Sequence, residues 1–407
     1  MRGTRGTAAI VAAAVLVPGA GHAARAQAAA RSDSAQGGPQ LASRGTVVDY
    51  PPGHVPRLPR VRASAFVLAD AGTGQVLAAR DPHGWFRPAS TLKVLTAVSL
   101  IPVLNPDATT VASHEAATVQ PNDVGLITGR RYKIADLFRA LLTISANDAA
   151  VALAQAAGSF RRGLQLMNAE AHDLQADDTV AKEPNGLDAR GQHTSAYDEA
   201  LIARRALAMP AFLKYDRTLA ARFELKPRHW VTLVNQNLML TDYPGDIGGK
   251  IGWTSRAGAT YIGMARRHGV TLIVTLLHCP SLTEFTYATR LLNWGFAVHG
   301  KVRPVGTLVS PLPPGSAPAQ KTHKAGSGGT GAAARPPGAR PASASGTAAR
   351  RPGARPAFPG GGLLAGPVAA GAGGGLVLVL AGAGLMLRRR RHSAAAAGRS
   401  RSGPLSG

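Results

Sequence analysis

Two side chains that could act together in acyl transfer lie three residues apart, in the stretch Pro88-Ala89-Ser90-Thr91-Leu92-Lys93. If a helix begins here, this spacing places the Lys93 amine and the Ser90 hydroxyl on one face of it. A lysine whose pKa is depressed by burial or by a nearby cation can take the serine proton and activate the hydroxyl. Ser-x-x-Lys also occurs in helices where the serine is a cap and the lysine is solvated, so the pair alone does not identify a catalytic site.

A second candidate group is Ser145-Ala146-Asn147, which lies between two expected helices. The Ser145 hydroxyl could relay a proton between a lysine and a leaving group, and the Asn147 amide could hold a peptide group of a substrate. Both residues also suit the N-cap of the following helix, which is the structural alternative.

A glycine-rich motif comes later in the chain, Gly248-Gly249-Lys250-Ile251-Gly252-Trp253-Thr254, and we expect it just before a strand. Glycines let a substrate backbone lie close to a strand edge, and Lys250 could offer a cation to a substrate carboxylate. The alternative is a glycine-rich turn with a solvated lysine.

The elements that must position these groups are read from apolar periodicity. Short apolar runs predict two hairpins, formed by residues 65–68 with 75–78 and by residues 260–265 with 270–277. Apolar residues three and four apart predict helices at 91–103, 134–143, 148–157, 160–173, 196–207 and 282–294. Strands at both ends with helices between them indicate an α+β fold: an antiparallel sheet flanked by helices, with an inserted helical region.

In their order and separations, the three motifs resemble the active-site set of the penicillin-recognising serine acyltransferases. The flanking sequence is similar to that of the D-alanyl-D-alanine carboxypeptidases, which are low-molecular-weight penicillin-binding proteins. The similar segments lie at residues 70–77, 137–154, 184–188, 235–237 and 291–296, together with Phe160, Met167, Asn168 and Ala171. The resemblance covers roughly residues 62 to 300.

This resemblance implies a β-lactamase/transpeptidase-like fold and a serine peptidase that hydrolyses the terminal D-Ala-D-Ala bond of peptidoglycan stem peptides. It implies Ser90 as the acylated nucleophile, Lys93 as the general base and Ser145 as a proton relay. The substrate-binding residues that it implies are Asn147, Lys250, Trp253 and Thr254. The backbone N–H groups of Ser90 and Trp253 would form the oxyanion hole. β-Lactam antibiotics would be covalent inhibitors, and no metal or organic cofactor is expected.

One position departs from the family pattern, which usually has Lys-Thr-Gly where this chain has Lys250-Ile251-Gly252. Ile251 has no hydroxyl to offer a terminal carboxylate. A lost charge-assisted hydrogen bond costs about 1.5 to 3 kcal/mol, or roughly ten- to a hundredfold in affinity. We therefore expect weaker substrate binding, unless Thr254 and Ser255 compensate.

Two other functions remain open from the sequence. A β-lactamase would need an added carboxylate to activate the deacylating water, and Glu183 is the candidate. A catalytically weak wall-binding homologue is the second alternative, which Ile251 favours and the intact Ser90, Lys93, Ser145 and Asn147 oppose.

The ends of the chain predict export and anchoring. In residues 1–28, Arg2 and Arg5 precede an apolar run and small residues, a pattern typical of a signal peptide. An N-terminal anchor is the alternative, although the run is shorter than the ~20 residues of a membrane span. Residues 29–60 predict a linker, 61–304 the peptidase domain, and 305–362 a disordered linker rich in Pro, Ala and Gly.

Residues 363–387 hold 25 residues without a charge, followed at once by four arginines at 388–391. This pattern predicts a transmembrane helix and a basic cytoplasmic tail at 388–407, which places the enzyme on the outer side of a bacterial cell membrane as a single-pass protein. A disordered tail is one alternative, because eight of the 25 residues are Gly or Pro. A cell-wall sorting signal is another, although no Leu-Pro-x-Thr-Gly sequence precedes it.

The formal net charge of +24 would ordinarily raise the question of nucleic-acid binding. Much of the excess arginine lies in the tail, and no motif interleaves aromatic with basic residues, so we expect no nucleic-acid partner. The single cysteine, Cys279, follows an apolar run and cannot form an intramolecular disulfide. His172, His193 and His278 show no metal-ligand spacing.

Overall fold

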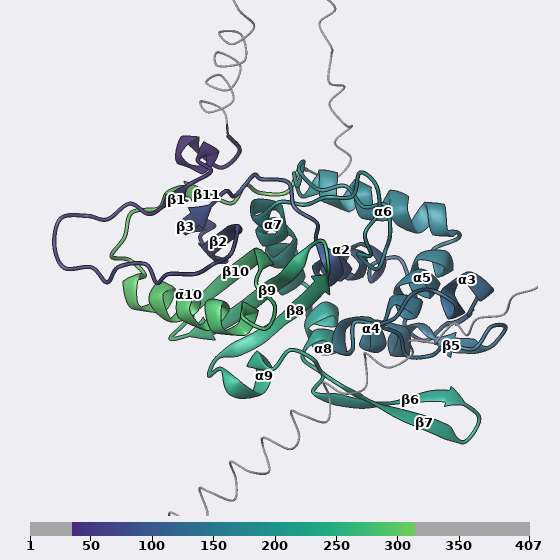
Figure 1. The fold of residues 1–407 in the computed structure, drawn as a ribbon. Helices are drawn as coiled ribbons and strands as arrows, with labels where there is room; N and C mark the ends of the chain where they lie inside the picture. Colours follow the sequence, from purple (N-terminus) through teal and green to yellow (C-terminus); the bar gives the residue numbers. More distant parts are fainter. Residues whose placement is uncertain (1–34, 314–407) are drawn as a thin grey trace, which may run out of the picture. The chain divides into compact units, whose positions relative to one another are not determined.

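An antiparallel sheet of seven strands is the scaffold of residues 35–313, the part of the chain that the computed structural model describes (Figure 1). Its strand order is β1-β3-β2-β10-β9-β8, with β11 also paired to β3. The strands are β1 (Thr46–Val47), β2 (Ala65–Asp70), β3 (Gln75–Arg80), β8 (Asp246–Thr254), β9 (Gly258–Arg267), β10 (Val270–Cys279) and β11 (Gly306–Thr307). Because β2 pairs with β10, the early and late segments join in one sheet, as predicted.

Both predicted hairpins are confirmed. In the β2–β3 turn, the Asp70 carboxylate accepts hydrogen bonds from the backbone N–H groups of Gly72 and Thr73, at 2.7 and 2.9 Å. The β9–β10 hairpin closes at the pair Arg267 and Val270.

The third motif was expected just before a strand, and this placement is wrong, because residues 246–254 themselves form β8. Glycine is poorly represented in strands, so the glycine-rich sequence hid the strand.

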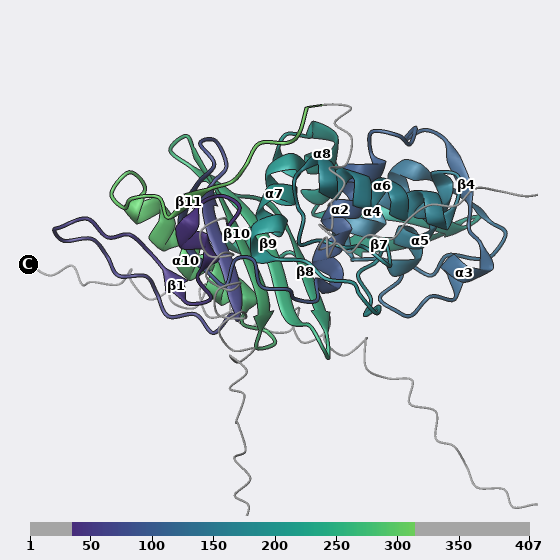
Figure 2. The same ribbon diagram turned by 90° about the horizontal axis from the view of Figure 1, so that it is seen from above.

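Helices cover both faces of the sheet, which explains why all six residues of β2 are buried. Figure 2 shows α10 (Glu284–Val298) on one side and α2 (Leu92–Leu100) with α7 (Ala196–Leu207) on the other. Two apolar clusters correspond to these two layers. The transpeptidase-like layout predicted from the sequence therefore holds in the described residues.

The inserted helical region lies between β3 and β8 and surrounds α2. It contains α3 (His114–Ala117), α4 (Ile134–Thr143), α5 (Asn147–Ala156), α6 (Phe160–Asp173) and α8 (Pro210–Asp216), and α9 (Met239–Asp242) leads into β8. All nine residues of α2 are buried, as expected for a helix that is apolar on most sides. Each helix predicted from periodicity is present, with small shifts at the ends.

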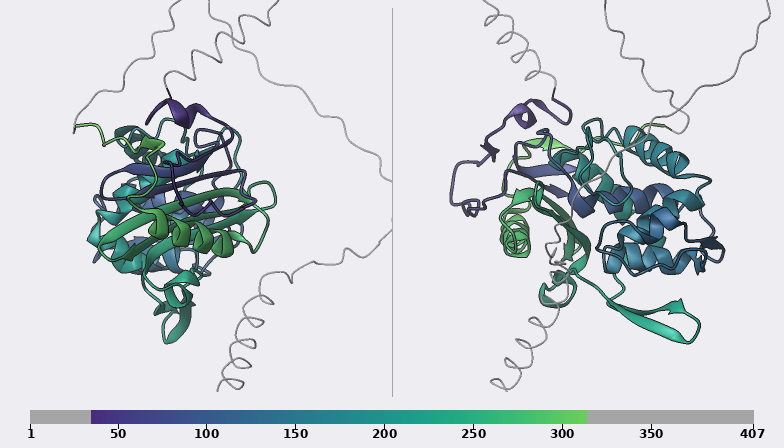
Figure 3. Two further views of the ribbon diagram at one scale, coloured as in Figure 1. Left: turned by 90° about the vertical axis from the view of Figure 1, so that its left-hand side faces the viewer. Right: turned by 45° about the vertical axis from the view of Figure 1, so that its right-hand side comes forward.

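Two small sheets were not predicted. Strands β4 (Thr109–Val111) and β5 (Arg131–Lys133) form one of them. Strands β6 (Ala220–Lys226) and β7 (His229–Val234) form the other, a hairpin that projects from the helical region (Figure 3).

The segment before residue 61 was predicted as a linker, yet its described part packs against the sheet. The short helix η1 (Pro39–Ala42) buries Leu41, and β1 pairs with β3. At the other end, the predicted domain boundary at residue 304 is too early, because β11 pairs with β3.

The predicted signal peptide, transmembrane helix and basic tail lie outside the described residues, as do the first residues of the 29–60 linker and most of the 305–362 linker. Between residues 35 and 313, no helix combines the length and apolar character needed to cross a membrane.

Candidate active site

The turn that carries Ser90 is a single 3-10 turn, η2 (Ala89–Thr91), that continues directly into α2. The carbonyl oxygen before it, on Pro88, accepts hydrogen bonds from the hydroxyls of Thr91 and Thr260, at 2.6 and 2.8 Å. Thr260 lies on β9. The nucleophile turn is therefore fastened to its own helix and to the sheet.

Two glycines let neighbouring segments approach this turn closely. A Cβ atom on Gly252 of β8 would lie 2.6 Å from the Ser90 backbone nitrogen, and one on Gly186 would lie 1.8 Å from the Ala89 carbonyl oxygen. Gly186 also has a φ of 83°, which disfavours other residues. The turn is thus held between the edge of the sheet and the loop that contains Gly186.

Lys93, one helical turn after Ser90, is fully buried with its amine among three oxygen atoms. Its Nζ lies 2.8 Å from Ser90 Oγ, 2.7 Å from Asn147 Oδ1 and 2.5 Å from the Asn185 carbonyl oxygen. Burial lowers the pKa of the Lys93 amine well below its usual value, the Lys250 charge lowers it further, and Asp148 opposes the shift. Lys93 is therefore suited to be a neutral base.

For a neutral Lys93 amine, the number of its donors and acceptors sets the direction of the contact with Ser90. A neutral amine has two N–H donors and one lone pair. The oxygens of Asn147 and Asn185 can only accept, so they take the two N–H groups. In the neutral form the lone pair then remains for the Ser90 hydroxyl, which can donate its proton toward Lys93 across the 2.8 Å contact. This is the arrangement that general-base activation of a serine requires.

The Ser145-x-Asn147 motif lies at the start of α5 but does not cap it through a side chain. The N-cap is Ala146, and no side-chain cap hydrogen bond forms there. Ser145 is buried with a left-handed φ of 62°, and its Oγ has no hydrogen-bond partner among the described residues. A strained, unpaired hydroxyl of this kind is consistent with a functional role rather than with capping.

Asn147 has two protein partners in addition to the substrate contact that was expected for it. Its Oδ1 accepts from Lys93, and its Nδ2 donates to the Gln120 carbonyl oxygen at 2.8 Å. The carboxamide therefore orients the base in this structure. The predicted contact of Asn147 with a substrate amide stays a prediction.

Asp148, the neighbour of Asn147, ties α5 to a loop. Its buried carboxylate accepts hydrogen bonds from the backbone N–H groups of Val124, Gly125 and Leu126, at 2.9 to 3.1 Å. Charge-assisted bonds of this type are stronger than neutral ones. Asp148 thus stabilises the start of the helix that carries Asn147.

Lys250 is buried in β8, and its Nζ donates to the Ile251 carbonyl oxygen at 2.9 Å. Burial lowers the pKa of Lys250 to about 8, and the nearby Asp216 opposes this shift. Asp216 ends α8 and accepts from the Gly249 backbone N–H at 2.8 Å, and burial raises the pKa of its carboxyl to about 8. Lys250 therefore has a buried acidic neighbour that the sequence did not reveal.

The remaining motif residues alternate along β8. Ile251 packs against the apolar cluster beneath α10. Trp253 is 59% exposed, and its indole N–H donates to Ser281 Oγ at 2.9 Å. The Thr254 hydroxyl lies 3.3 Å from Asp188 Oδ1 and so connects β8 to the loop around Gly186. The structure brings Ser90, Lys93 and Asn147 into contact and places β8 directly beside them.

Sequence reasoning missed Glu199, which lies behind the nucleophile on α7. Its side chain is fully buried and contacts the hydroxyl of Thr91. No sequence signal marked it, because the same helix also carries the charged residues Asp198, Arg204 and Arg205. Among residues 35–313, no group of three or more His, Cys, Asp or Glu side chains is arranged to hold a metal ion.

Known proteins are similar to this chain in sequence and in fold. The model of a family described as D-alanyl-D-alanine carboxypeptidase matches residues 53–281. The D-alanyl-D-alanine carboxypeptidase DacB2 of Mycobacterium tuberculosis is 37% identical over 264 residues, which is 63% of this chain and 90% of the relative. DacD of Escherichia coli is 34% identical over 256 residues, or 59% of this chain, and the match spans 64% of the length of that relative.

Solved structures agree with these matches. The crystal structure of a D-alanyl-D-alanine carboxypeptidase from Mycobacterium tuberculosis has a TM-score of 0.61 at 37% identity, covering 64% of this chain and 99% of that one. A variant of a Streptomyces DD-transpeptidase has a TM-score of 0.56 at 26% identity, and the match covers 59% of this chain and 99% of that one. Penicillin-binding protein 6B of Escherichia coli has a TM-score of 0.55 at 32% identity, and the match covers 61% of this chain and 81% of that one.

Proposed function

The chain belongs to the family of D-alanyl-D-alanine carboxypeptidases, serine hydrolases of the penicillin-binding type, and on this premise we propose which of its residues perform the reaction. The observation that carries the assignment is the contact of the buried Lys93 amine with the Ser90 hydroxyl, whose Oγ lies 2.8 Å from Lys93 Nζ.

In acylation, the Ser90 hydroxyl loses its proton to Lys93 while Oγ attacks the carbonyl carbon of the penultimate D-Ala. The backbone N–H groups of Ser90 and Trp253 stabilise the oxyanion of the tetrahedral intermediate. The intermediate then collapses as the bond to the terminal D-Ala breaks. The leaving amine takes a proton that is passed from Lys93 through Ser145, whose hydroxyl has no other partner among the described residues.

In deacylation, water replaces the amine. Lys93 takes a proton from the water, the hydroxide attacks the ester, and the Ser90 oxygen recovers its proton as the shortened peptide leaves. β-Lactams acylate the same serine and block it. The β-lactamase alternative has less support, because the named relatives are carboxypeptidases.

The substrate lies along β8, the last strand of the main sheet, whose outer edge is not paired to another described strand. An extended peptide can align with such an edge through backbone hydrogen bonds. Lys250 supplies positive charge for the terminal carboxylate, and Thr254 and Asn147 bind the acyl part of the peptide.

We further propose that the protein is exported and remains anchored in the bacterial membrane by residues 363–387, with the enzyme outside. Support comes from the uncharged stretch and the four arginines after it. Membrane fractionation of cells that express the full chain or a chain ending at residue 362 tests this. Retention of the shortened chain in the membrane fraction would contradict it.

Mass spectrometry of the purified protein incubated with penicillin, together with D-alanine release from a pentapeptide ending in D-Ala-D-Ala, tests the catalytic assignment. We expect an adduct and D-alanine release in the wild type and neither in Ser90→Ala. No adduct in the wild type would leave only the non-catalytic wall-binding alternative. An adduct without release would place the defect in substrate recognition.

A further inference from the structure

A hollow of about 420 Å³ lies beside the nucleophile turn and has no role in the reaction described above. Trp85 and Arg87 line it on one side, residues 188–193 on another, and Arg256 completes it. Arg87 precedes Ser90 by three residues, and Arg256 follows Thr254 by two. The hollow therefore continues the active site past the end of β8.

The hollow carries an excess of positive charge. Three guanidinium groups line it, from Arg87, Arg190 and Arg256, against the single carboxylate of Asp188. Asp188 lies 3.7 Å from Arg87. Within residues 35–313, no hydrogen bond or ion pair engages the side chains of Arg190 and Arg256. Two guanidinium groups without protein partners in one hollow favour an anionic ligand, and a carboxylate matches their planar donors.

The aromatic wall of the hollow is held in place although it is exposed. Trp85 is 67% exposed, and its ring stacks on His193 with centroids 4.2 Å apart. Its indole N–H donates to Asp178 Oδ1 at 2.8 Å.

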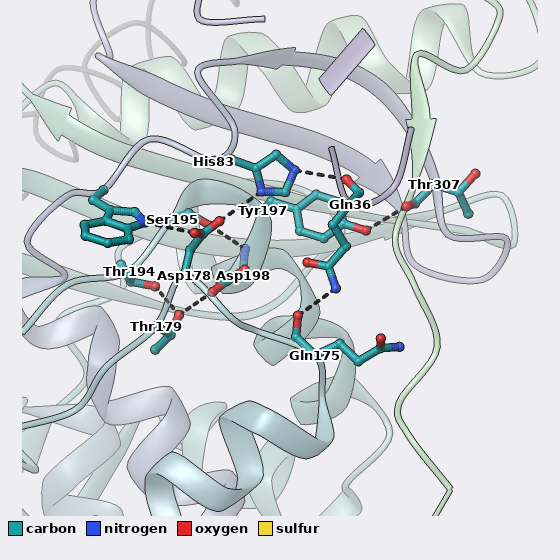
Figure 4. Close-up of polar contacts among 11 residues, drawn as sticks. Gln36, His83, Gln175, Asp178, Thr179, Thr194, Ser195, Tyr197, Asp198 and Thr307 are labelled. Carbon is teal, nitrogen blue, oxygen red and sulfur yellow. Dashed lines mark hydrogen bonds and ion pairs between the residues drawn. The ribbon is translucent and has the colours of Figure 1, made fainter. Parts of the chain in front are cut away.

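Asp178 is in turn held by His83, whose Nδ1 lies 3.1 Å from Asp178 Oδ2, while His83 Nε2 contacts the Gln36 carbonyl oxygen (Figure 4). Burial alone would raise the pKa of Asp178, but the hydrogen bonds from His83 and Trp85 outweigh it and hold this pKa below its usual value. The wall is thus fixed by an ionised carboxylate and does not need a ligand to form.

The position of the hollow along β8 indicates which part of a substrate reaches it. The Ser90 backbone lies beside Gly252, and Thr254 is two residues farther along the strand, or about 7 Å at the usual rise of a strand. An extended peptide advances by the same rise, about 3.4 Å per residue. If the terminal carboxylate lies toward Lys250, the residue before the D-Ala-D-Ala pair lies toward Arg256.

We propose that this hollow is a specificity subsite for a carboxylate on the residue that precedes D-Ala-D-Ala. The inference rests on the proposed function of the site. In stem peptides, a diaminopimelate at this position carries such a carboxylate beside an ammonium group, whereas a lysine carries an ammonium group without a carboxylate. Arg190 and Arg256 bind the carboxylate, and the fixed ring of Trp85 packs against the aliphatic part of the side chain.

Three acetylated tripeptides of the form X-D-Ala-D-Ala, with X as glutamate, glutamine or lysine, test the subsite with the full chain. We expect kcat/KM to decrease in the order glutamate, glutamine, lysine, with about a tenfold difference between the first and the last at low salt. The difference should shrink at 0.5 M salt, because the arginines are exposed and are screened.

The double variant Arg190→Gln/Arg256→Gln should hydrolyse the glutamate and glutamine peptides at equal rates while keeping wild-type activity on the glutamine peptide. Arg161→Gln/Arg228→Gln is the matched control, since it removes the same charge at two exposed arginines that do not line the hollow. This control should keep the preference for glutamate.

The outcomes separate the two levels of the proposal. Equal kcat/KM for the glutamate and lysine peptides in the wild type would overturn the subsite while leaving the carboxypeptidase intact. A preference that survives in Arg190→Gln/Arg256→Gln would also overturn it. Hydrolysis of none of the three peptides by the wild type would overturn the proposed function, and the subsite with it.

Discussion

The hydroxyl of Thr91, the residue after the nucleophile, contacts the buried carboxyl of Glu199 on α7. The same hydroxyl lies 2.6 Å from the Pro88 carbonyl oxygen, which can only accept a hydrogen bond. Thr91 has one proton, so if that proton goes to Pro88, the contact with Glu199 needs a proton from the carboxyl. Burial raises the pKa of Glu199 well above its usual value, which agrees with a protonated carboxyl that donates to Thr91.

Replacement of Glu199 therefore tests a positioning role behind Ser90. We expect Glu199→Gln to retain acylation by penicillin within about threefold, because its amide can donate to Thr91, whereas Glu199→Leu loses a buried hydrogen bond worth about 1 kcal/mol and shifts the turn. Acylation rates and urea unfolding measure both effects. In the Leu variant, kcat should fall more than KM changes. Equal losses of acylation rate in the Glu199→Gln and Glu199→Leu variants would show that a hydrogen-bond donor at this position is not needed.

The pH dependence of activity should have two limbs set by the two buried lysines. Lys93 must be neutral to accept the Ser90 proton, so kcat/KM should rise as pH increases through its lowered pKa. Lys250 has a pKa of about 8, so above that pH it loses the charge that attracts the terminal carboxylate, and KM should rise. Steady-state kinetics from pH 5 to 10 measure both limbs.

A peptide with an amide in place of its terminal carboxylate is the control for the alkaline limb. Its KM should not change near pH 8, because it offers no anion to Lys250. If both peptides show the same rise in KM, the alkaline limb does not come from carboxylate binding.

Local patterns accounted for most of the elements that position the site. Apolar spacing predicted α4, α6 and α7 with the bounds that the structure has. The β6–β7 hairpin was not predicted because few of its side chains are buried. Phe223 is the buried residue of β6 and Leu233 that of β7, so the alternation of apolar residues is weak. Pattern reading depends on a buried face, and this hairpin has little of one.

The site was predictable only where its partners are close in sequence. The spacing of Ser90 and Lys93 indicated their contact directly. Asn185, which accepts from Lys93 across 92 residues, and Asp216, which contacts Gly249 across 33, come together only through the closure of the tertiary fold. No local pattern encodes such pairs, and their roles are visible only in the folded structure.

Substitution of Asp148 should destabilise the start of α5. Asp148→Asn leaves one oxygen and one N–H₂ group to face four backbone donors, those of residues 124–126 and Ala149, so at least one donor loses its partner at a cost of about 1 to 3 kcal/mol. Urea unfolding should show this loss, and acylation should slow because Asn147 helps to orient Lys93. Asp177→Asn, at an exposed aspartate, is the control. Equal stability of the two variants would contradict the role of Asp148.

Ile251→Thr tests whether the missing family hydroxyl limits this enzyme. The Ile251 side chain is only partly buried against the cluster beneath α10, so the loss of apolar contact should cost about 1 kcal/mol of unfolding free energy. A restored hydroxyl adds a charge-assisted hydrogen bond to the terminal carboxylate, and we expect KM for a D-Ala-D-Ala peptide to fall about tenfold. The amide-ended peptide should show no such gain, because it lacks the carboxylate. If KM is unchanged for both peptides, residue 251 does not contact the substrate terminus, and Lys250 carries its recognition without help from that position.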